Sequence, residues 1–400
     1  MSSCAKCGAC TTVCPVYRSS GREGHSARGK LHLIDVLGLA GSSTVFVDIF
    51  SACLLCGACS AICPRQIDIE QELIAARSSF SVLSGPHSYE KYLARKLLDH
   101  PGSLAGLRLL GRACGRVLDG RLPEDSGLRL RLAMFRDDAV SASVTEDASA
   151  AVVGGTTLTW FPGCSARYLF PDVLASCRTL FAKNSLNLHF PEALVCCGLA
   201  HWAAGDTEAA RRSGRKNIEA LEETDGPILV SCASCYSQLK KYPRLFAGAE
   251  GWQQRAAKMA MRVVELSVFL EELEGEQSVV SSGGNDKIRV FYHDPCHLRH
   301  DVDVVDMSRQ QLLKLGNVEI VELPDGPRCC GQGGLFHVAQ PEISAGIRDR
   351  LVADVLALQP DIVTTGCSGC LMQWQQGLAA AGSDVRVLHL AQLLKGTETA

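Results

Sequence analysis

The sequence of 400 residues lacks a hydrophobic run long enough to cross a membrane. The longest near-candidate, Val36 to Val47, is shorter than the ~18 apolar residues that a spanning helix needs. It also lacks an excess of charge, with 40 Lys and Arg against 43 Asp and Glu, which argues against a nucleic-acid surface. No apolar secretory segment is expected at the N-terminus, because four cysteines occupy its place. With 46% hydrophobic and 21% charged residues, the chain should form two or three globular domains.

Cysteine is the residue in which the sequence is rich, with 20 copies. Secreted disulfide scaffolds can use that many, but they are small, whereas this chain is large and shows no secretory signal. In a reducing compartment, clustered cysteines are far more often metal ligands. The composition therefore predicts a cytoplasmic metalloprotein.

A short cysteine motif occurs twice near the N-terminus, with the spacing C-x-x-C-x-x-C-x-x-x-C-P and an offset of 49 residues. This is the pattern of bacterial ferredoxins with two [4Fe–4S] clusters, in which the fourth cysteine of each motif binds the other cluster. The predicted ligands are Cys4, Cys7, Cys10 and Cys63 for one cluster, and Cys53, Cys56, Cys59 and Cys14 for the other. Gly8 and Gly57 should relieve crowding where backbone amides turn toward the sulfurs. Two zinc sites are the alternative, but zinc sites usually take two separated ligand pairs, so the pattern favours clusters.

A longer pattern of five cysteines also occurs twice. The first copy consists of Cys164, Cys196, Cys197, Cys232 and Cys235, and the second of Cys296, Cys329, Cys330, Cys367 and Cys370. In each copy the lone cysteine ends a strand-like run, and the C-x-x-C pair ends another such run and opens a helical pattern. Open α/β sheets place ligand sites at such positions, and helix N-termini favour thiolates. Five cysteines exceed the four that a cubane or a zinc ion needs, so each copy is expected to bind something unusual.

The arrangement C…C-C-G…C-x-x-C, present twice after a ferredoxin motif, resembles the cysteine-rich CCG domains of heterodisulfide reductases and their relatives. Three groups share this order: the fused catalytic subunit of heterodisulfide reductase, the iron–sulfur subunit of glycolate oxidase and D-lactate dehydrogenase complexes, and one of the subunits of anaerobic glycerol-3-phosphate dehydrogenase. The resemblance covers residues 1–80 and 156–395. It implies that each five-cysteine set binds a noncubane [4Fe–4S] cluster, in addition to the two cubane clusters of the ferredoxin motifs.

Repeats and resemblance together predict an α/β protein with two pseudo-symmetric cysteine-rich CCG domains and an α-helical ferredoxin module. The expected domains are 1–80 for the ferredoxin module, 81–155 for a helical connector and linker, 156–275 for the first CCG domain and 287–395 for the second. Segments 141–156 and 274–286 are expected to be linkers. In the connector, Arg108, Arg112, Arg116 and Arg121 recur at near-helical spacing. Intervening glycines favour a solvated helix on the ferredoxin module over one that binds a membrane or partner.

The function hypotheses rest on what the clusters can do without another cofactor. The segment Gly21 to Asp35 resembles the glycolate and lactate type, whereas two complete five-cysteine sets are typical of the disulfide reductases. No flavin or nicotinamide fingerprint is found, so the chain can carry single electrons but shows no place to accept a hydride. The favoured hypothesis is an electron-transfer subunit that relays electrons from an FAD-containing glycolate or D-lactate dehydrogenase partner to a quinone, a cytochrome or another redox protein. The alternatives are a heterodisulfide-type reductase, and a chain in which one CCG set binds zinc or nothing.

A few residues remain outside these motifs. Cys114 and Cys177 have no partner motif and are expected to be core or surface thiols. The histidines near the CCG cysteines, His201, His293, His297, His300 and His337, could donate to sulfur or relay a proton, but structural hydrogen bonding is the favoured role. We expect a cytoplasmic protein whose membrane contact would be peripheral and made through a partner or the arginine-bearing helix.

Overall fold

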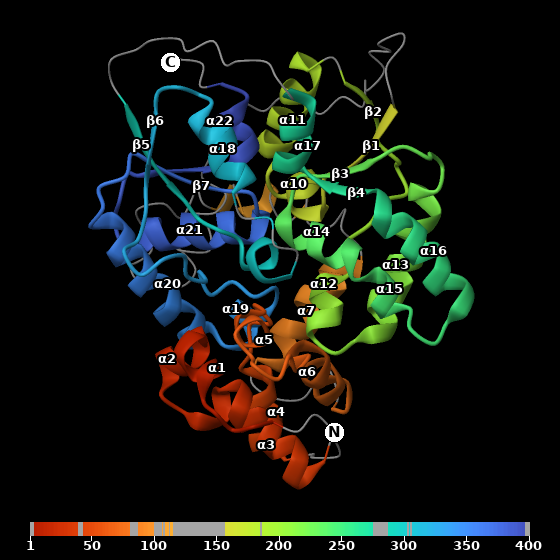
Figure 1. Cartoon of the computed structure of the whole chain (residues 1–400), viewed down its shortest axis with the longest axis vertical. Coiled ribbons are helices and arrows are strands. Elements are labelled where there is room, and N and C mark those ends of the chain that lie inside the picture. Colours follow the sequence, from red (N-terminus) through yellow and green to blue (C-terminus); the bar gives the residue numbers. More distant parts are fainter. Residues whose placement is uncertain are drawn as a thin grey trace.

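The computed structural model describes residues 4–38, 43–80, 87–99, 157–184, 186–274, 287–301, 304 and 306–396, with short helical pieces at 106, 109–111 and 113–114. A helical N-terminal module lies at one end of the molecule, and two α/β domains lie side by side at the other (Figure 1). The predicted fold class is thereby confirmed. Within the described ranges, no helix is both long and apolar enough to cross a membrane.

The N-terminal module consists of short helices, several of which are capped by side chains at their first turn. Its elements are α1 (Ala9–Val13), α2 (Pro15–Ser20), the 3₁₀ turn η1 (Glu23–His25), α3 (Ala27–Leu37), α4 (Thr44–Ser51), α5 (Ala58–Ala61) and α6 (Ile69–Ser78). Ser26, Ser43 and Asp68 each accept a hydrogen bond from an amide in the helix that follows. Such caps satisfy donors that a helix start leaves unpaired. Phe50 and Leu73 are buried where α4 and α6 pack together.

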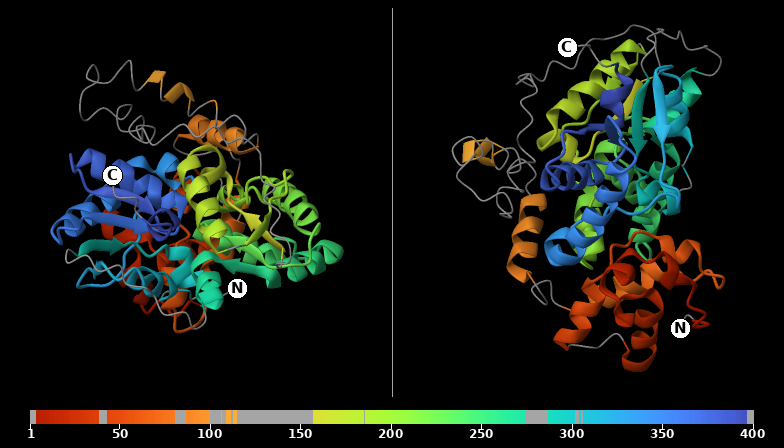
Figure 2. Two further views of the ribbon diagram at one scale, coloured as in Figure 1. Left: turned by 90° about the horizontal axis from the view of Figure 1, so that it is seen from above. Right: turned by 90° about the vertical axis from the view of Figure 1, so that its left-hand side faces the viewer.

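The connector is described mainly by one helix, α7 (Ser88–Asp99), which runs along the outside of the molecule (Figure 2). It packs against α19 of the second CCG domain, and its Arg95 forms an ion pair with Asp206 of the first. The four connector arginines, Arg108, Arg112, Arg116 and Arg121, lie outside the described residues, as do segments 141–156 and 275–286. Residue 274 ends helix α17.

The first CCG domain is built on a four-stranded parallel sheet with the order β2-β1-β3-β4. Its strands are β1 (Thr157–Phe161), β2 (Asn187–His189), β3 (Ile228–Val230) and β4 (Val263–Glu265). Its helices are α10 (Cys164–Tyr168), α11 (Pro171–Lys183), α12 (Leu199–Ala203), α13 (Thr207–Leu221), α14 (Ala233–Lys240), α15 (Tyr242–Leu245), α16 (Glu250–Arg262) and α17 (Leu266–Glu274). Strand β3 is apolar and buried throughout, as expected of a parallel strand covered on both faces.

The second CCG domain repeats this topology in a parallel sheet of order β6-β5-β7-β8. Its elements are β5 (Ile288–Tyr292), the π-helical turn η2 (His297–Asp301), α18 (Met307–Leu313), β6 (Val318–Val321), α19 (Phe336–Ala339), α20 (Pro341–Leu356), β7 (Ile362–Thr365), α21 (Ser368–Ala380), β8 (Arg386–His389) and α22 (Leu390–Leu394). In both sheets, the second strand of the sequence lies at one edge and the first lies beside it. The shared order is what the long sequence repeat predicts.

The three bodies share buried side chains. Helix α11 packs on α22, α17 on α18, and α14 on η2, which joins the two CCG domains. The N-terminal module docks through α2 against α20, and its Val16 and Ala52 share an apolar cluster with Phe336 and Ile347 of the second CCG domain. Because buried apolar area is the main attraction between packed elements, the module is held as part of one body.

A buried ionic cluster joins the same three bodies. The amino group of Lys241, at the end of α14, lies 2.8 Å from a Glu70 carboxylate oxygen of α6 and 2.8 Å from an Asp301 carboxylate oxygen of η2. Ser237 donates a hydrogen bond of 2.6 Å to the same Asp301. The three charged side chains are at most 15% exposed, so solvent screens their attraction weakly.

Candidate metal centres

The outer cysteine group, defined as Cys4, Cys7, Cys10 and Cys63, lines one cavity of the N-terminal module. Three of these residues belong to the loop and first turn of α1, and the fourth follows α5, which packs against α1. Gly8 begins α1 with a φ of 84°, a left-handed conformation that glycine adopts without strain. Cys7 is exposed and the other three are partly exposed. The turn at Gly8 therefore gathers four thiols near the surface.

The inner cysteine group, defined as Cys14, Cys53, Cys56 and Cys59, lines a second cavity. The structure thus places the fourth cysteine of each motif with the first three of the other. Gly57 begins α5 with a φ of 79°, and a Cβ there would lie 2.9 Å from the Cβ of His300. Only a glycine therefore allows both the turn and the close approach of the second CCG domain. Burial raises the pKa of Cys14 and Cys56, so these thiols would need a cation to be held as thiolates.

The first CCG group comprises Cys164, Cys196, Cys197, Cys232 and Cys235, whose thiols contact one another in series. Cys164 is hydrogen-bonded to Cys196, Cys196 to Cys197, Cys197 to Cys235, and Cys235 to Cys232. Cys164 opens α10 shortly after the end of β1, and Cys232 immediately precedes α14 shortly after the end of β3, as the sequence pattern predicts. Hydrogen bonds from Cys196 and Cys235 lower the pKa of Cys197 to about 6, which favours a thiolate, the form that binds metals.

The second CCG group repeats this series with Cys296, Cys329, Cys330, Cys370 and Cys367. Hydrogen bonds from Cys296 and Cys330 hold the pKa of Cys329 well below the ordinary thiol value, and Cys232 and Cys370 do the same for Cys367. His293 lies beside this group, with one ring nitrogen within 4.8 Å of the sulfurs of Cys330 and Cys370. Three soft or imidazole donors so close together suit a transition metal or an iron–sulfur cluster.

The two CCG groups meet at a single pair of thiols. Cys232 of the first domain is hydrogen-bonded to Cys367 of the second, and their exposed fractions are 5% and 2%. The Ser234 hydroxyl lies 3.2 Å from the Cys367 sulfur and 3.0 Å from Nδ1 of His297. With Cys367 as a thiolate, the hydroxyl donates to the sulfur and accepts from the imidazole. The junction is therefore a dry contact that both domains build.

The inner group adjoins the second CCG group, and the outer group adjoins the inner one. Cys56 of the inner group packs in one cluster with Cys296 and Cys329 of the second CCG group and lines the same cleft. Burial raises the pKa of Cys59, and the neighbouring thiols that add to this rise include Cys10 of the outer group. Together with the contact between Cys232 and Cys367, these neighbours order the four groups in one series: outer, inner, second CCG, first CCG.

Two buried cations flank the inner group. Lys30 of α3 is 1% exposed and donates to the His25 carbonyl, and Arg77 of α6 is 7% exposed. Neither is ion-paired with a carboxylate in the described part of the chain, and the charges that oppose the burial of Lys30 belong to the thiols of Cys53, Cys14 and Cys59. An uncompensated buried cation is costly. The observation fits an anionic group held by these cysteines, such as a thiolate-ligated iron–sulfur cluster.

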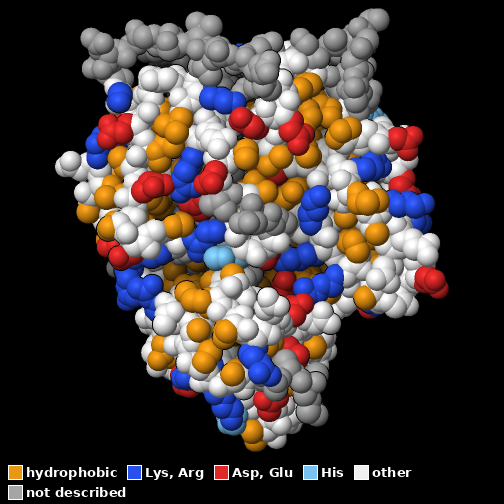
Figure 3. Space-filling model, in the orientation of Figure 1, with side chains coloured by type: hydrophobic (Ala, Val, Ile, Leu, Met, Phe, Trp, Pro, Cys, Tyr) orange, Lys and Arg blue, Asp and Glu red, His pale blue; other side chains and the backbone are white. Residues whose placement is uncertain are grey.

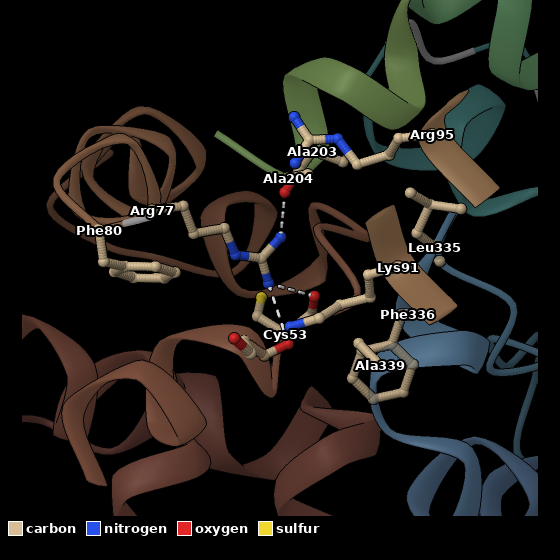
Figure 4. A pocket seen from close by; sticks show the side chains of 12 residues that line it. Cys53, Arg77, Phe80, Lys91, Arg95, Ala203, Ala204, Leu335, Phe336 and Ala339 are labelled. Carbon is tan, nitrogen blue, oxygen red and sulfur yellow. Dashed lines mark hydrogen bonds between the residues drawn. The ribbon is translucent and has the colours of Figure 1, made fainter. Parts of the chain in front are cut away.

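Arg77 is held by backbone carbonyls at two helix ends (Figure 4). Its guanidinium donates to the carbonyls of Phe50, Ser51 and Cys53 around the end of α4, and to Ala203 at the end of α12. The negative ends of two helix dipoles thus meet the guanidinium. Lys91 and Arg95 line the same pocket, beside the aromatic rings of Phe80 and Phe336.

A cleft of about 470 Å³ separates the N-terminal module from the second CCG domain. Cys56, Cys296 and Cys329 lie on its walls, together with four arginines, Arg18, Arg299, Arg328 and Arg350. On the face shown in Figure 3, the surface is hollowed between the lower and upper parts of the molecule, with Lys and Arg side chains at the margin. Of the two CCG groups, the second is therefore the one that borders this open cleft.

The other residues that the sequence singled out are two cysteines and five histidines, and their surroundings in the structure are as follows. Cys177 is fully buried in an apolar cluster, and burial raises its pKa to about 12. Cys114 lies in a short helical piece and is half-buried. His337 is hydrogen-bonded to Gln332 and the Gly334 carbonyl, His300 to Arg299, and His201 is buried in α12. His293 lies against the second CCG group, His297 contacts Ser234, a hydrogen-bond partner of Cys367, and His300 lines the cleft with Cys296 and Cys329.

Sequence patterns gave no sign of Lys30, Arg77 or Ser234. Lys30 and Arg77 occur in helices with ordinary mixed composition, and Ser234 is one of the two variable residues of a C-x-x-C motif. Their significance depends on neighbours that are distant in the sequence, so a single sequence contains no periodic signal for them.

Comparison with known proteins identifies similar sequences for most of the chain. Residues 1–67 match the 4Fe-4S dicluster domain family, and residues 158–240 and 290–375 match the cysteine-rich domain family. Lactate utilization protein A of Oceanobacillus iheyensis is 30% identical over 234 residues, which are 58% of this chain and 94% of that protein. The probable glycolate oxidase iron-sulfur subunit of Bacillus subtilis is 27% identical over 417 aligned positions, covering 98% of this chain and 92% of that protein.

Proposed function

The chain belongs to the family of iron–sulfur proteins with cysteine-rich CCG domains that includes lactate utilization protein A, and from that premise we propose that it is the electron-transfer subunit of a 2-hydroxy acid dehydrogenase complex. The electron donor is an FAD-containing partner subunit that oxidises glycolate or D-lactate, and the acceptor is a quinone, a cytochrome or another redox protein. A relative named as a glycolate oxidase iron-sulfur subunit matches along 98% of the chain, which supports this choice of partner.

The observation that carries the proposal is the single series of four cysteine groups. The outer and inner groups adjoin through Cys10 and Cys59, and the inner and second CCG groups through Cys56 and Cys329. The two CCG groups touch through Cys367 and Cys232. Loaded with metal, such a series forms a path for single electrons, whereas the sequence contains no fingerprint for a hydride-accepting cofactor.

We assign four [4Fe–4S] clusters to the series. The outer and inner groups, with four thiols each, would hold cubane clusters, and the five-thiol CCG groups would hold noncubane clusters. These clusters supply one-electron carriers. The chain's own side chains hold the sulfurs in place, exclude water from the junction at Cys232 and Cys367, and set the charge around each group.

The first test is an anaerobic purification of the tagged chain from its host, followed by addition of D-lactate or glycolate. We expect a flavin-bearing chain in the same fraction and bleaching of the broad visible absorbance of the clusters. The chain freed of that flavoprotein should not bleach, because its sequence contains no fingerprint for a hydride-accepting cofactor. Absence of both the flavoprotein and bleaching would overturn the proposal.

A disulfide reductase is the second candidate, because both five-cysteine sets are complete and meet at Cys232 and Cys367. Such an enzyme would reduce a disulfide to two thiols with two protons and two electrons, the electrons coming one at a time from an external reductant through the clusters. The Cys367→Ser variant should then abolish disulfide turnover, while Cys177→Ala, which alters a buried cysteine outside the four groups, should retain it. Absence of turnover by the wild-type chain with any disulfide would eliminate this candidate.

A further inference from the structure

The charged surroundings of the two groups in the N-terminal module differ sharply. Arg28 interacts with Cys10 of the outer group, but its side chain is 33% exposed and ion-paired with Glu23 at 2.8 Å. Lys30 and Arg77 flank the inner group, and both are almost completely buried. Solvent and a carboxylate therefore screen the outer cation, whereas neither screens the two inner ones.

Buried charge has a large effect on a neighbouring redox group. Coulomb attraction between two charges is several times stronger at the low effective dielectric of a protein interior than in water. Reduction of a thiolate-ligated cluster adds one negative charge, and burial alone opposes this addition because it removes the stabilising water. A fixed cation in the same buried region stabilises the added negative charge and so favours reduction.

We propose that Lys30 and Arg77 act on the inner cluster by holding its reduction potential above that of the outer cluster. The inference rests on the proposed function, because it requires a cluster in both groups. Lys30 acts on the side of Cys14, Cys53 and Cys59, and Arg77 acts beside Cys53. Their positions are fixed, since the amine is tied to the His25 carbonyl and the guanidinium to four carbonyls.

The consequence is a direction for electron flow within the module. An electron that arrives at the outer group is drawn to the inner group, which lies against Cys329 of the second CCG domain. The cations thereby collect electrons at the docked side of the module and away from the exposed Cys7.

The test is a redox titration of the full-length, cluster-loaded chain, followed by electron paramagnetic resonance. The variants Lys30→Met and Arg77→Gln each remove one buried charge. At the potential that half-reduces the wild-type inner cluster, we expect the ratio of reduced to oxidised inner cluster to fall at least tenfold, which corresponds to about 59 mV for a one-electron couple. The midpoint potential of the outer cluster should not change. A Cys7→Ser variant, altered in one outer ligand, identifies the outer signal.

Two controls separate charge from structure. Arg77→Lys keeps the charge while it loses part of the hydrogen bonding, so it should titrate close to the wild type. Arg28→Gln removes an exposed cation and should leave both midpoints nearly unchanged. If Lys30→Met or Arg77→Gln retains its full iron content and the midpoint potential of its inner cluster is unchanged, the inference is overturned. A wild-type chain without iron in the module would instead overturn the proposed function itself.

Discussion

The two CCG domains share a topology and a cysteine pattern, yet they occupy different positions in the molecule. Cys329 and Cys296 of the second domain border the open cleft and lie near Cys56 of the N-terminal module. In the first domain, the equivalent Cys196 is buried, and the equivalent Cys164 is half-buried and lines a pocket of about 10 Å³, far smaller than the cleft. Duplication therefore produced two similar groups, and docking of the module on one side made them the third and fourth members of a series.

The domain junction is asymmetric in the same way. Ser234 of the first domain hydrogen-bonds to Cys367, but its sequence equivalent in the second domain is Gly369, which has no hydroxyl to offer Cys232. Hydrogen bonds to sulfur stabilise the more negative, reduced form of a cluster. Two groups related by a sequence repeat are thus expected to differ in potential because of one side chain.

The largest effect is expected from substitutions that interrupt the series of cysteine groups at equivalent cysteines of the two CCG domains. Cys330→Ser and Cys197→Ser should each lower the iron content from about sixteen to about twelve atoms per chain. With the donor feeding the outer group, Cys330→Ser should leave the first CCG group unreduced, because the preceding member of the series is missing. In Cys197→Ser the second CCG group should still be reduced. Rapid-mixing spectroscopy with the flavoprotein partner checks this order, and identical behaviour of the two variants would contradict it.

A smaller effect is expected from the ionic cluster that ties the module to both domains. Lys241→Met leaves Glu70 and Asp301 without their shared cation, and removal of one partner from a buried pair typically costs about 3–5 kcal/mol. We expect a lower urea midpoint for loss of the visible cluster absorbance. The control, Arg255→Gln, breaks a pair with Glu222 that is more than one-third exposed, and should change the midpoint little. Equal urea midpoints for the two variants would show that the ionic cluster around Lys241 does not hold the module in place.

The smallest expected effect concerns the junction itself. Ser234→Ala removes one hydrogen bond of about 1 kcal/mol net, which is roughly a fivefold change in the reduced-to-oxidised ratio of the second CCG centre. The mirror variant is Gly369→Ser, for which the new Cβ would meet Gln332 at 3.4 Å and Cys367 at 3.8 Å, ordinary contact distances. It should raise the potential of the first CCG centre instead. Redox titration checks both, and a shift of the same centre in both variants would contradict the assignment.

Much of the site was predictable because metal ligation leaves a periodic signal. Thiols that share a cluster must lie at fixed short spacings, so the ferredoxin motifs and both five-cysteine sets are visible in the sequence. The parallel sheets were predictable for a related reason, since in each copy the lone cysteine and the C-x-x-C pair follow strand-like runs. In the structure, Cys232 lies two positions after the last residue of β3 and Cys367 two positions after that of β7, where helices α14 and α21 begin.

The contacts between groups were not predictable in this way. Cys232 and Cys367 are 135 positions apart, and Ser234 meets His297 across the domain interface. No spacing rule relates residues of two domains whose relative placement depends on packing, here of α11 on α22 and α14 on η2. The burial of Lys30 was equally hidden, because a lysine in a short amphipathic helix is usually exposed.

The sequence by itself determined which thiols belong to each group and that two sheets carry the larger groups. These properties follow from local spacing, which every copy of a motif must obey to surround its metal. Only the tertiary structure decided the order of the four groups, the charge beside the inner one and the dry junction between the CCG domains. Those properties depend on the packing of distant surfaces, where burial lowers the local dielectric and gives single side chains their effect.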